Sequence, residues 1–256
     1  GAMVYVALTG LDKKDCQNVF AAVKGGADLG DNGACAGNDV VPAMQKKLGA
    51  DGWWGVAVQF VDNPADADAA AAALKTWANN RDGSKILDDA KAEFEAWRKP
   101  PKQEIALCSD EEKKLWRMSE TVLRMGQVRE ANTATRKNHG MILASLPVGE
   151  WHTGWVRDAQ YAIVALSRMG HFAEAKAALD FYWNAGPVGK LKSYVSNQDY
   201  RISVVRYFGT GEEEADYDQN GPNVEIDGWG MVMWSSRQYV EASGDTAWLD
   251  TRTGAG

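Results

Sequence analysis

Two hydrophobic patterns divide the chain. Near the N-terminus, residues 4–8 and 53–61 are short runs rich in β-branched and aromatic residues, which is typical of strands. After Asn63 the apolar residues recur at helical spacing, first in an alanine-rich stretch at 65–79 and then at 84–98. The sequence therefore predicts strands followed by helices.

From residue 109 onward the pattern is mostly helical. Ser109 and Glu112 have the spacing of a capping box, which predicts that a helix begins there. One apolar stripe at helical spacing follows: Leu115, Met118, Val122, Met125 and Val128.

The next helices form a hairpin pattern. Helices are predicted at 155–169 and 172–183, and Gly170 between them favours a tight antiparallel turn. Further helices are expected at 199–208 and 224–242.

These patterns predict a mainly α protein with a β-rich N-terminal part. We expect that strand-rich part at 1–63, a helical linker at 64–108 and stacked αα-hairpins at 109–256. The helical hairpins repeat without strong repetition of the sequence itself.

The composition narrows the ligand class. Of 256 residues, 28 are Lys or Arg and 35 are Asp or Glu, giving a net charge of −7. No dense basic cluster offsets this balance, so a nucleic-acid partner is not expected. The 11 tryptophans are unusual, and a flat indole face suits the C–H face of a sugar ring. Composition therefore favours a carbohydrate.

Cysteine and histidine give no sign of a metal site or cofactor. Either Cys16 and Cys35 pair and leave Cys108 free, or all three are reduced. The histidines at 139, 152 and 171 are too scattered to bind a metal together. No apolar run has transmembrane length, so no membrane partner is expected, while the compartment stays open.

The densest group of candidate ligand-binding residues lies where a loop enters a predicted helix. Arg157 and Asp158 fall in its first turn and point to different sides; Asp158 gains from the helix dipole, and Arg157 offers a planar fork of donors. Trp151 and Trp155 supply ring faces, and His152 beside them could bind a hydroxyl. An alternative stays open in which Asp158 caps the helix, Arg157 pairs with a surface acid and both tryptophans are core.

A second polar group occupies a similar junction. Asp227, Gly228, Trp229 and Gly230 stand at the start of a predicted helix, where two glycines are costly by propensity. Such a cost needs a packing or ligand reason. In the structural reading, the glycines let two helices approach closely and Asp227 is a cap.

Together these motifs resemble family 15 glycoside hydrolases, the glucoamylase-like enzymes. The resemblance covers nearly the whole chain. It is carried by Ala144-Ser145-Leu146-Pro147, Trp155-Val156-Arg157-Asp158-Ala159, Ala165-Leu166 with Gly170, Ile226-Asp227-Gly228-Trp229-Gly230, Ser243-Gly244-Asp245 and Trp248-Leu249, and at the front by Gly37-Asn38-Asp39-Val40-Val41 and Val58-Gln59-Phe60.

The resemblance implies a fold and an activity. Residues 109–256 would be the first part of an (α/α)6 toroid, and residues 1–63 the tail of the β super-sandwich that precedes it in bacterial members. Arg157 and Asp158 would bind hydroxyls of the terminal glucose, with Trp155 nearby, and Asp227 would shape the pocket. The implied reaction is inverting hydrolysis of an α-glucosidic bond at the non-reducing end of an α-glucan or α-glucoside oligosaccharide.

Two departures from the family pattern qualify these expectations. The family's general acid, a Glu in a Trp-Glu-Glu type of motif, and its later catalytic base would both fall after Gly256. We therefore expect no catalytic residue here, and we expect the rest of the same protein, or a companion chain, to complete the toroid. Gly221-Pro222-Asn223 stands where many members have a tryptophan, which puts starch-like substrates in doubt.

Other functions remain open from the sequence. One is a non-catalytic carbohydrate-binding or regulatory relative that kept the sugar pocket. Another is a different toroid enzyme, such as a trehalase or a disaccharide phosphorylase. The cleaved linkage, the oligomeric state and the location, whether secreted, periplasmic or cytoplasmic in a bacterium, stay open.

Overall fold

The computed structural model describes residues 2–7, 12–15, 24, 29–30, 43–49, 52–78, 83–99, 109–146, 151–186, 188–214, 217–218 and 221–253. This part of the chain is mainly α-helical, with small antiparallel sheets, which confirms the predicted class at that level. The toroid stays a prediction. Cys16, Cys35 and Cys108 lie outside the described residues.

Residues 1–96 and 97–256 form two compact units. Helix α3 (Gly83–Trp97) ends at the boundary between them. This boundary lies inside the stretch 64–108, for which the sequence predicted a linker, and the three-part division itself stays a prediction.

In the first unit a helix covers a pair of strands. Strand β1 (Ala2–Ala7) pairs antiparallel with β4 (Val56–Val61), and β2 (Lys13–Asp15) pairs with β3 (Ala43–Gln45). Helix α2 (Ala67–Ala78) packs on β1 and β4. Their shared core is Val4, Val6, Val61 and Ala70. Two strands and the helix at 65–79 were thus predicted correctly, apart from their ends.

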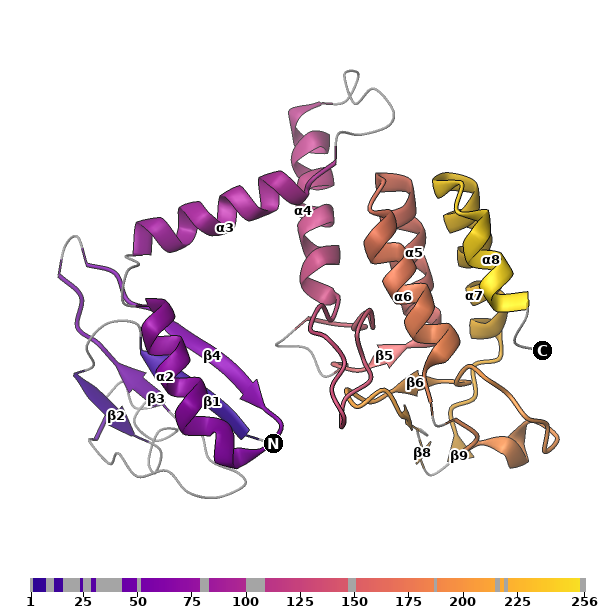
Figure 1. The fold of residues 1–256 in the computed structure, drawn as a ribbon, viewed down its shortest axis with the longest axis horizontal. Coiled ribbons are helices and arrows are strands. Elements are labelled where there is room, and N and C mark those ends of the chain that lie inside the picture. Colours follow the sequence, from indigo (N-terminus) through magenta and orange to yellow (C-terminus); the bar gives the residue numbers. More distant parts are fainter. Residues whose placement is uncertain are drawn as a thin grey trace. The chain divides into compact units, whose positions relative to one another are not determined.

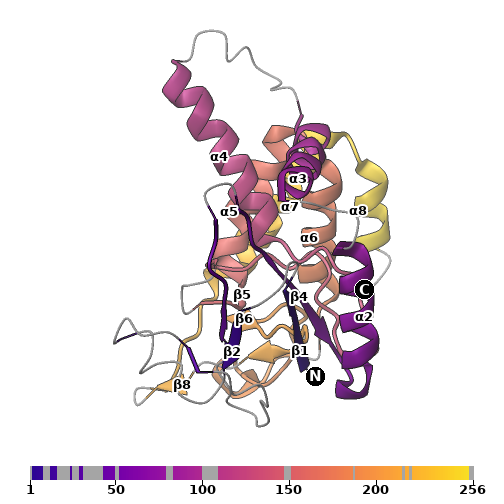
Figure 2. The same cartoon turned by 90° about the vertical axis from the view of Figure 1, so that its left-hand side faces the viewer.

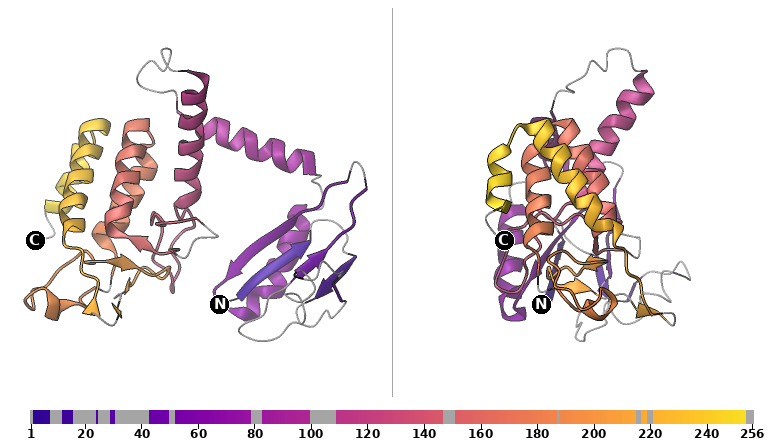
Figure 3. Two further views of the ribbon diagram at one scale, coloured as in Figure 1. Left: turned by 180° about the vertical axis from the view of Figure 1, so that it is seen from behind. Right: turned by 90° about the vertical axis from the view of Figure 1, so that its right-hand side faces the viewer.

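The helices of the second unit run beside one another (Figures 1 and 3). They are α4 (Asp110–Gly126), α5 (Val156–Met169), α6 (Phe172–Asn184), α7 (Asp227–Ser243) and α8 (Thr246–Thr253). Helix α5 packs on both α6 and α7, and α6 also packs on α7.

Glycine turns join these helices into hairpins. Gly170 ends α5 with φ of 88°, and Gly244 ends α7 with φ of 75°. A side chain is strained at positive φ, so glycine fits both turns. The hairpin predicted around Gly170 is confirmed, and α7 begins three residues later than predicted.

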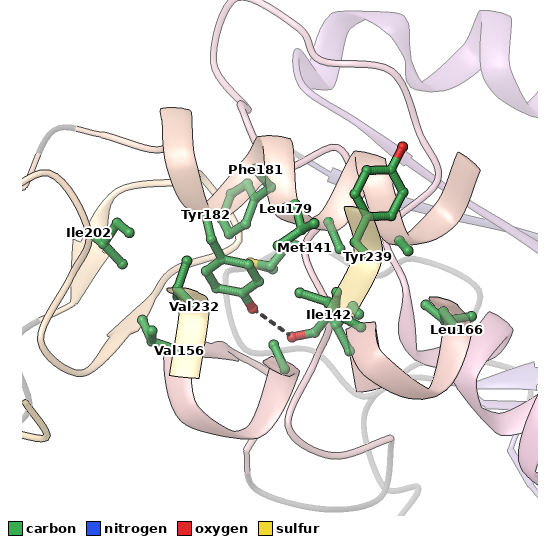
Figure 4. Packing of buried hydrophobic residues seen from close by; sticks show 14 of the residues in the cluster. Met141, Ile142, Val156, Leu166, Leu179, Phe181, Tyr182, Ile202, Val232 and Tyr239 are labelled. Atoms are coloured by element: carbon green, nitrogen blue, oxygen red, sulfur yellow. Dashed lines mark hydrogen bonds between the residues drawn. The ribbon is translucent and has the colours of Figure 1, made fainter. Parts of the chain in front are cut away.

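Aromatic rings fill the core between α5, α6 and α7 (Figure 4). Tyr182 is fully buried and packs edge-on against Phe181 and Tyr207. Its hydroxyl donates to the Ile142 carbonyl at 3.4 Å. Burial raises the pKa of Tyr182, so its phenol stays neutral.

Helix α4 is held through polar groups. Its capping box is present, as predicted from Ser109 and Glu112. The buried Glu120 carboxylate binds His171 Nε2 at 2.8 Å and accepts a hydrogen bond from Arg117 at 2.8 Å. Trp97 stacks on the His171 ring with a centroid distance of 3.8 Å. This buried ionic cluster links α4 to the turn between α5 and α6.

The apolar stripe predicted on α4 is largely exposed. Exposed fractions range from 50% to 64% at four of its positions: Leu115, Met118, Val122 and Met125. Helix α4 lies against α5 (Figure 2), and Leu123, which is not part of the stripe, packs against the main core.

The helix predicted at 199–208 is wrong. A short strand, β6 (Arg206–Tyr207), ends this segment, and the residues before it form bends. The Tyr207 hydroxyl accepts from the Ser203 N–H at 2.7 Å, and the Ser203 hydroxyl accepts from the Val205 N–H at 3.1 Å. These side-chain bonds satisfy backbone groups that a helix would have used.

Candidate functional site

The site is built on a three-stranded sheet at the start of α5. Strand β6 pairs antiparallel with β5 (Gly154–Trp155) on one side and with β7 (Glu213–Glu214) on the other. Because β5 leads directly into α5, the sheet fixes where that helix begins (Figure 1).

The two residues just before β6, Val204 and Val205, connect the start of α5 to the start of α7. The Val156 N–H donates to the Val205 carbonyl at 3.0 Å, and the Glu225 N–H donates to the Val204 carbonyl at 2.8 Å. A Cβ on Gly228 would meet the Val156 side chain at 3.1 Å, so only a glycine fits there without a shift. The first turns of α5 and α7 therefore lie against each other.

This geometry partly confirms the structural reading of the second polar group. Gly228 permits the close helix approach, whereas a Cβ on Gly230 would point into open space. Asp227 is the first helical residue, Ile226 occupies the cap position, and the Asp227 carboxylate binds a side chain of α5.

That side chain is Arg157. Its Nε and Nη2 donate to the two Asp227 oxygens, each at 2.9 Å, and its Nη1 lies 3.6 Å from Glu225 Oε2. The hydrogen bonds from Arg157 hold the pKa of Asp227 below its usual range, and the pKa of Arg157 is raised by the same bonds. Both groups are therefore charged at neutral pH. The alternative prediction that Arg157 pairs with an exposed acid is confirmed.

Asp158 faces a different side of α5. It lines a pocket of about 310 Å3 between α4, α5 and the segment 142–146. Adjacent residues in a first turn diverge, as the sequence predicted, so the structure does not bring Asp158 and Arg157 to one point. Trp155, rather than Asp158, occupies the cap position of α5.

The two tryptophans form a corner beside an arginine. Trp151 and Trp155 meet edge to face, with ring centroids 5.1 Å apart. The Arg206 guanidinium lies 4.2 Å from the Trp155 ring centroid and 5.9 Å from that of Trp151. It also binds Glu214 at 2.8 Å. Trp155 is 9% exposed and Trp151 is 52% exposed, so the expectation that both are core is wrong for Trp151.

Two hydrogen bonds to Ser145 hold the backbone of Trp151, in the loop just before β5. The Ser145 N–H donates to the Trp151 carbonyl at 3.0 Å, and the Ser145 hydroxyl accepts from the Trp151 N–H at 3.2 Å. His152 follows in this loop and is exposed. The exposed indole of Trp151 therefore stands on a fixed backbone.

Several buried acceptor atoms near these residues are unused. Glu225 Oε2, Glu214 Oε2 and Thr153 Oγ1 have no hydrogen-bond partner in the part of the chain that the structure describes. These atoms lie below the accessible surface, and Glu225 Oε2 faces Arg157 Nη1 at 3.6 Å, so they contribute negative charge behind the site rather than acceptors that a ligand contacts. The site thus combines an exposed ring face, a fixed cation and the exposed Asp227 carboxylate, which suits a polyhydroxylated ring.

The sequence did not identify three members of this site: Arg206, Glu214 and Glu225. Arg206 lies in the segment wrongly expected to be helical, and only the pairing of β5 with β6 brings it to Trp155. Glu214 belongs to the acidic run 212–214, a pattern typical of a solvated surface, yet its neighbour Glu213 is fully buried. The run 203–207 contains two β-branched valines, a tyrosine and a serine whose side chain competes for backbone hydrogen bonds. This composition could have indicated a strand.

Within the described ranges, no group of three or more His, Cys, Asp or Glu side chains is placed to hold a metal ion. No described helix is both long and apolar enough to cross a membrane. Comparisons with protein-family models, curated proteins and solved structures found no match.

Proposed function

We propose that this chain is part of a glucoamylase-like glycoside hydrolase that releases glucose from the non-reducing end of α-glucosides with inversion. One observation carries the proposal. An exposed indole, a buried indole and the Arg157–Asp227 pair gather at the adjacent N-termini of α5 and α7. A sugar ring offers C–H faces to indoles and hydroxyls to charged groups.

Each side chain then has a role in holding the sugar. The exposed Trp151 indole stacks on one face of the sugar ring, and the buried Trp155 indole supports that of Trp151 from below. Arg157 donates to hydroxyl oxygens, and the remaining lone pairs of the exposed Asp227 carboxylate accept from hydroxyl protons.

Asp158 and His152 belong to the same binding assignment. Asp158 forms a second wall, on the side of α5 that faces the segment 142–146. His152, exposed beside Trp151, contacts a hydroxyl at the rim. The motif order of the sequence supports both assignments.

The chemistry of inversion needs two further carboxyl groups. One protonates the leaving oxygen and the other activates water on the opposite face of the sugar. The proposal assigns neither role to residues 1–256. Asp227 and Glu225 instead supply negative charge, which stabilises the positive centre that develops at the anomeric carbon.

A non-catalytic carbohydrate-binding or regulatory relative is the second candidate. The observation that favours it is the Arg157 guanidinium, which two acids already neutralise in the free protein. A pair that joins two helices can serve structure alone. A trehalase or disaccharide phosphorylase would share the toroid, and a phosphate requirement would identify the phosphorylase.

Sugar binding provides the first test. Maltose titrated into the 256-residue chain should shift the indole N–H resonances of Trp151 and Trp155, whereas the β-linked cellobiose should not. Trp151→Ala should weaken maltose binding about tenfold, which corresponds to about 1.4 kcal/mol. Arg237→Ala, at an exposed arginine on α7 outside the candidate site, is the control and should leave maltose binding unchanged. Unmoved indole resonances at saturating maltose would contradict the proposal.

Activity provides the second test. A protein that contains this segment and the remaining catalytic residues should release β-glucose from maltose, which polarimetry detects. Asp158→Asn should reduce kcat/KM by the value of a charged hydrogen bond, about 1.5–3 kcal/mol. Sugar binding without glucose release would select the non-catalytic relative.

A further inference from the structure

A second aromatic pocket lies on another side of α7. It occupies about 410 Å3 between the end of α6, the segment 195–202 and α7. Trp229 lines it, two residues after Asp227, which corresponds to about 200° around the helix. The pocket is therefore separate from the candidate site. Its lining includes three aromatic residues, Trp183, Tyr200 and Trp229, and the polar residues Gln198, Asp199 and Arg201.

The polar atoms of its three large rings are all engaged within the protein. Trp183 Nε1 donates to the Ser236 hydroxyl at 3.2 Å, and Trp229 Nε1 donates to the Ile202 carbonyl at 2.8 Å. The Tyr200 hydroxyl donates to the Glu213 carboxylate at 2.9 Å. Since every polar atom is used, the rings offer only their carbon surfaces to the pocket.

Glu213 fixes the position of Tyr200. This fully buried carboxylate also accepts from the N–H groups of Gly189 and Lys190, at 2.7 and 2.8 Å. Burial and the Glu213 contact raise the pKa of Tyr200 to about 12, so its hydroxyl remains a donor at neutral pH. Tyr200 and Trp229 stand at an angle of 41° with centroids 5.8 Å apart. The rings are thus held in place before any ligand arrives.

The backbone of the pocket's rim is strained. Ser196 and Asn197 have φ of 57° and 56°, in the left-handed region that most side chains avoid. A hydrogen bond from the Asn197 N–H to the Lys192 carbonyl, at 2.9 Å, helps to hold this turn. Strain of this kind persists where the surrounding structure enforces it, and it often marks a ligand site.

The rim also carries groups that recognise hydroxyls. Gln198 and Arg201 are exposed and offer an amide and a guanidinium, while Asp199 pairs with Lys192. Carbon faces below and hydrogen-bonding groups around the edge complement a sugar ring, whereas a planar aromatic ligand would leave the rim groups unmatched. The volume lies near the small end of ligand pockets, roughly 300–1,000 Å3, which suits one or two rings.

We propose that this pocket is a second sugar-binding site, which holds a ring of an α-glucan outside the candidate site. The choice of an α-glucan rests on the proposed function, whereas the pocket's affinity for a sugar ring rests on its own rings and rim. Such a site would hold a long substrate on the protein while its end occupies the candidate site.

Indole resonances can test both sites in one titration of the 256-residue chain with maltotriose. Trp183→Phe and Trp229→Phe assign the two pocket resonances. These resonances should shift with maltotriose, and Arg201→Ala should raise the apparent dissociation constant at the pocket about fivefold, the effect of one hydrogen bond. Arg237→Ala, an exposed arginine elsewhere on α7, should leave it unchanged. Arg157→Ala should also leave it unchanged, because that residue belongs to the candidate site.

The possible outcomes separate the two proposals. Shifts at Trp183 and Trp229 without shifts at Trp151 and Trp155 support this pocket and contradict the candidate site. The reverse pattern overturns the second sugar-binding site. It is also overturned if Arg201→Ala has no effect, or if the pocket responds to a planar aromatic probe such as indole but not to maltotriose.

Discussion

Helices α4 and α5 have the same kind of sequence but opposite burial. Both carry apolar residues at helical spacing, and both were predicted from that spacing. In α5 the apolar residues Ile163 and Leu166 are fully buried. In α4 the apolar Leu115 and Met118 are 64% and 55% exposed, while the charged Glu120 is fully buried.

The difference shows what an apolar stripe predicts. It predicts a helix, and it predicts a face that would gain free energy from cover. It does not predict what provides the cover. Helix α5 is covered by α6 and α7, whereas α4 is attached through Glu120, which binds Arg117 and His171, and Trp97 stacks on the His171 ring. An exposed stripe of this kind marks a surface that can accept an apolar partner.

The largest expected effect is at a buried apolar position of α5. Leu166→Ala should reduce the free energy of unfolding by about 2–5 kcal/mol, because it removes buried methyl groups and leaves a cavity. The matched substitution on α4 is Leu115→Ala, which should change it by less than about 0.5 kcal/mol. Urea unfolding followed by circular dichroism measures both. Equal losses would mean that the α4 stripe is covered in solution.

The sequence was sufficient where local chemistry decides the structure. The Ser109 and Glu112 capping box, the Gly170 turn and the helix at 155–169 each depend on residues close in sequence, and each was predicted correctly apart from the helix ends. Gly228 was also identified as a point of close helix approach, because an expensive glycine in a helix needs a packing reason.

The sequence was insufficient where distant segments decide. The segment 203–207 is not helical, because its carbonyls accept from the starts of α5 and α7 and its strand pairs with β5. Arg206 reaches Trp155 only through that pairing. Likewise, nothing local shows that Asp227 would bind Arg157, since 70 residues separate them. The assembly of the candidate site therefore depends on tertiary contacts.

The next largest effect concerns the polar attachment of α4. Glu120→Gln should cost about 1.5–3 kcal/mol at neutral pH, because it removes the charge that binds His171 and Arg117. Burial acts to raise the pKa of Glu120, but hydrogen bonds from His171 and Arg117 outweigh it, so the pKa lies below the usual 4.5. The carboxylate therefore stabilises the fold above about pH 4.5, and this contribution is lost as the pH falls through the lowered pKa.

Thermal unfolding of the wild type and Glu120→Gln at several pH values tests this cluster. The difference in melting temperature should be full at pH 7 and should shrink below pH 4.5. Glu241→Gln, on the exposed face of α7, is the control for loss of one carboxylate and should show little difference at any pH. A Glu120 difference that persists at low pH would contradict an ionic attachment.

A smaller effect is expected at the exposed pair of the candidate site. Asp227→Asn should destabilise the chain less than Glu120→Gln, because solvent screens the Arg157–Asp227 pair. Since hydrogen bonds from Arg157 lower the pKa of Asp227, its contribution is present at neutral pH and is lost as the pH falls through that lowered value. The same pH series measures it, with high salt as a second variable. A loss as large as that of Glu120→Gln would contradict the expectation that solvent screens the Arg157–Asp227 pair.

The smallest expected effect is on the α4 stripe itself. Met118→Gln with Val122→Gln keeps good helix formers and removes only exposed apolar surface, so the free energy of unfolding should change by less than about 0.5 kcal/mol. Ile163→Gln on α5 is the control and should prevent stable folding, because it buries an unpaired amide. If the stripe is an unused contact surface, the double substitution should also lower any self-association measured by analytical ultracentrifugation. A large loss of stability from the α4 substitutions would instead place the stripe inside the fold and remove the contrast with α5.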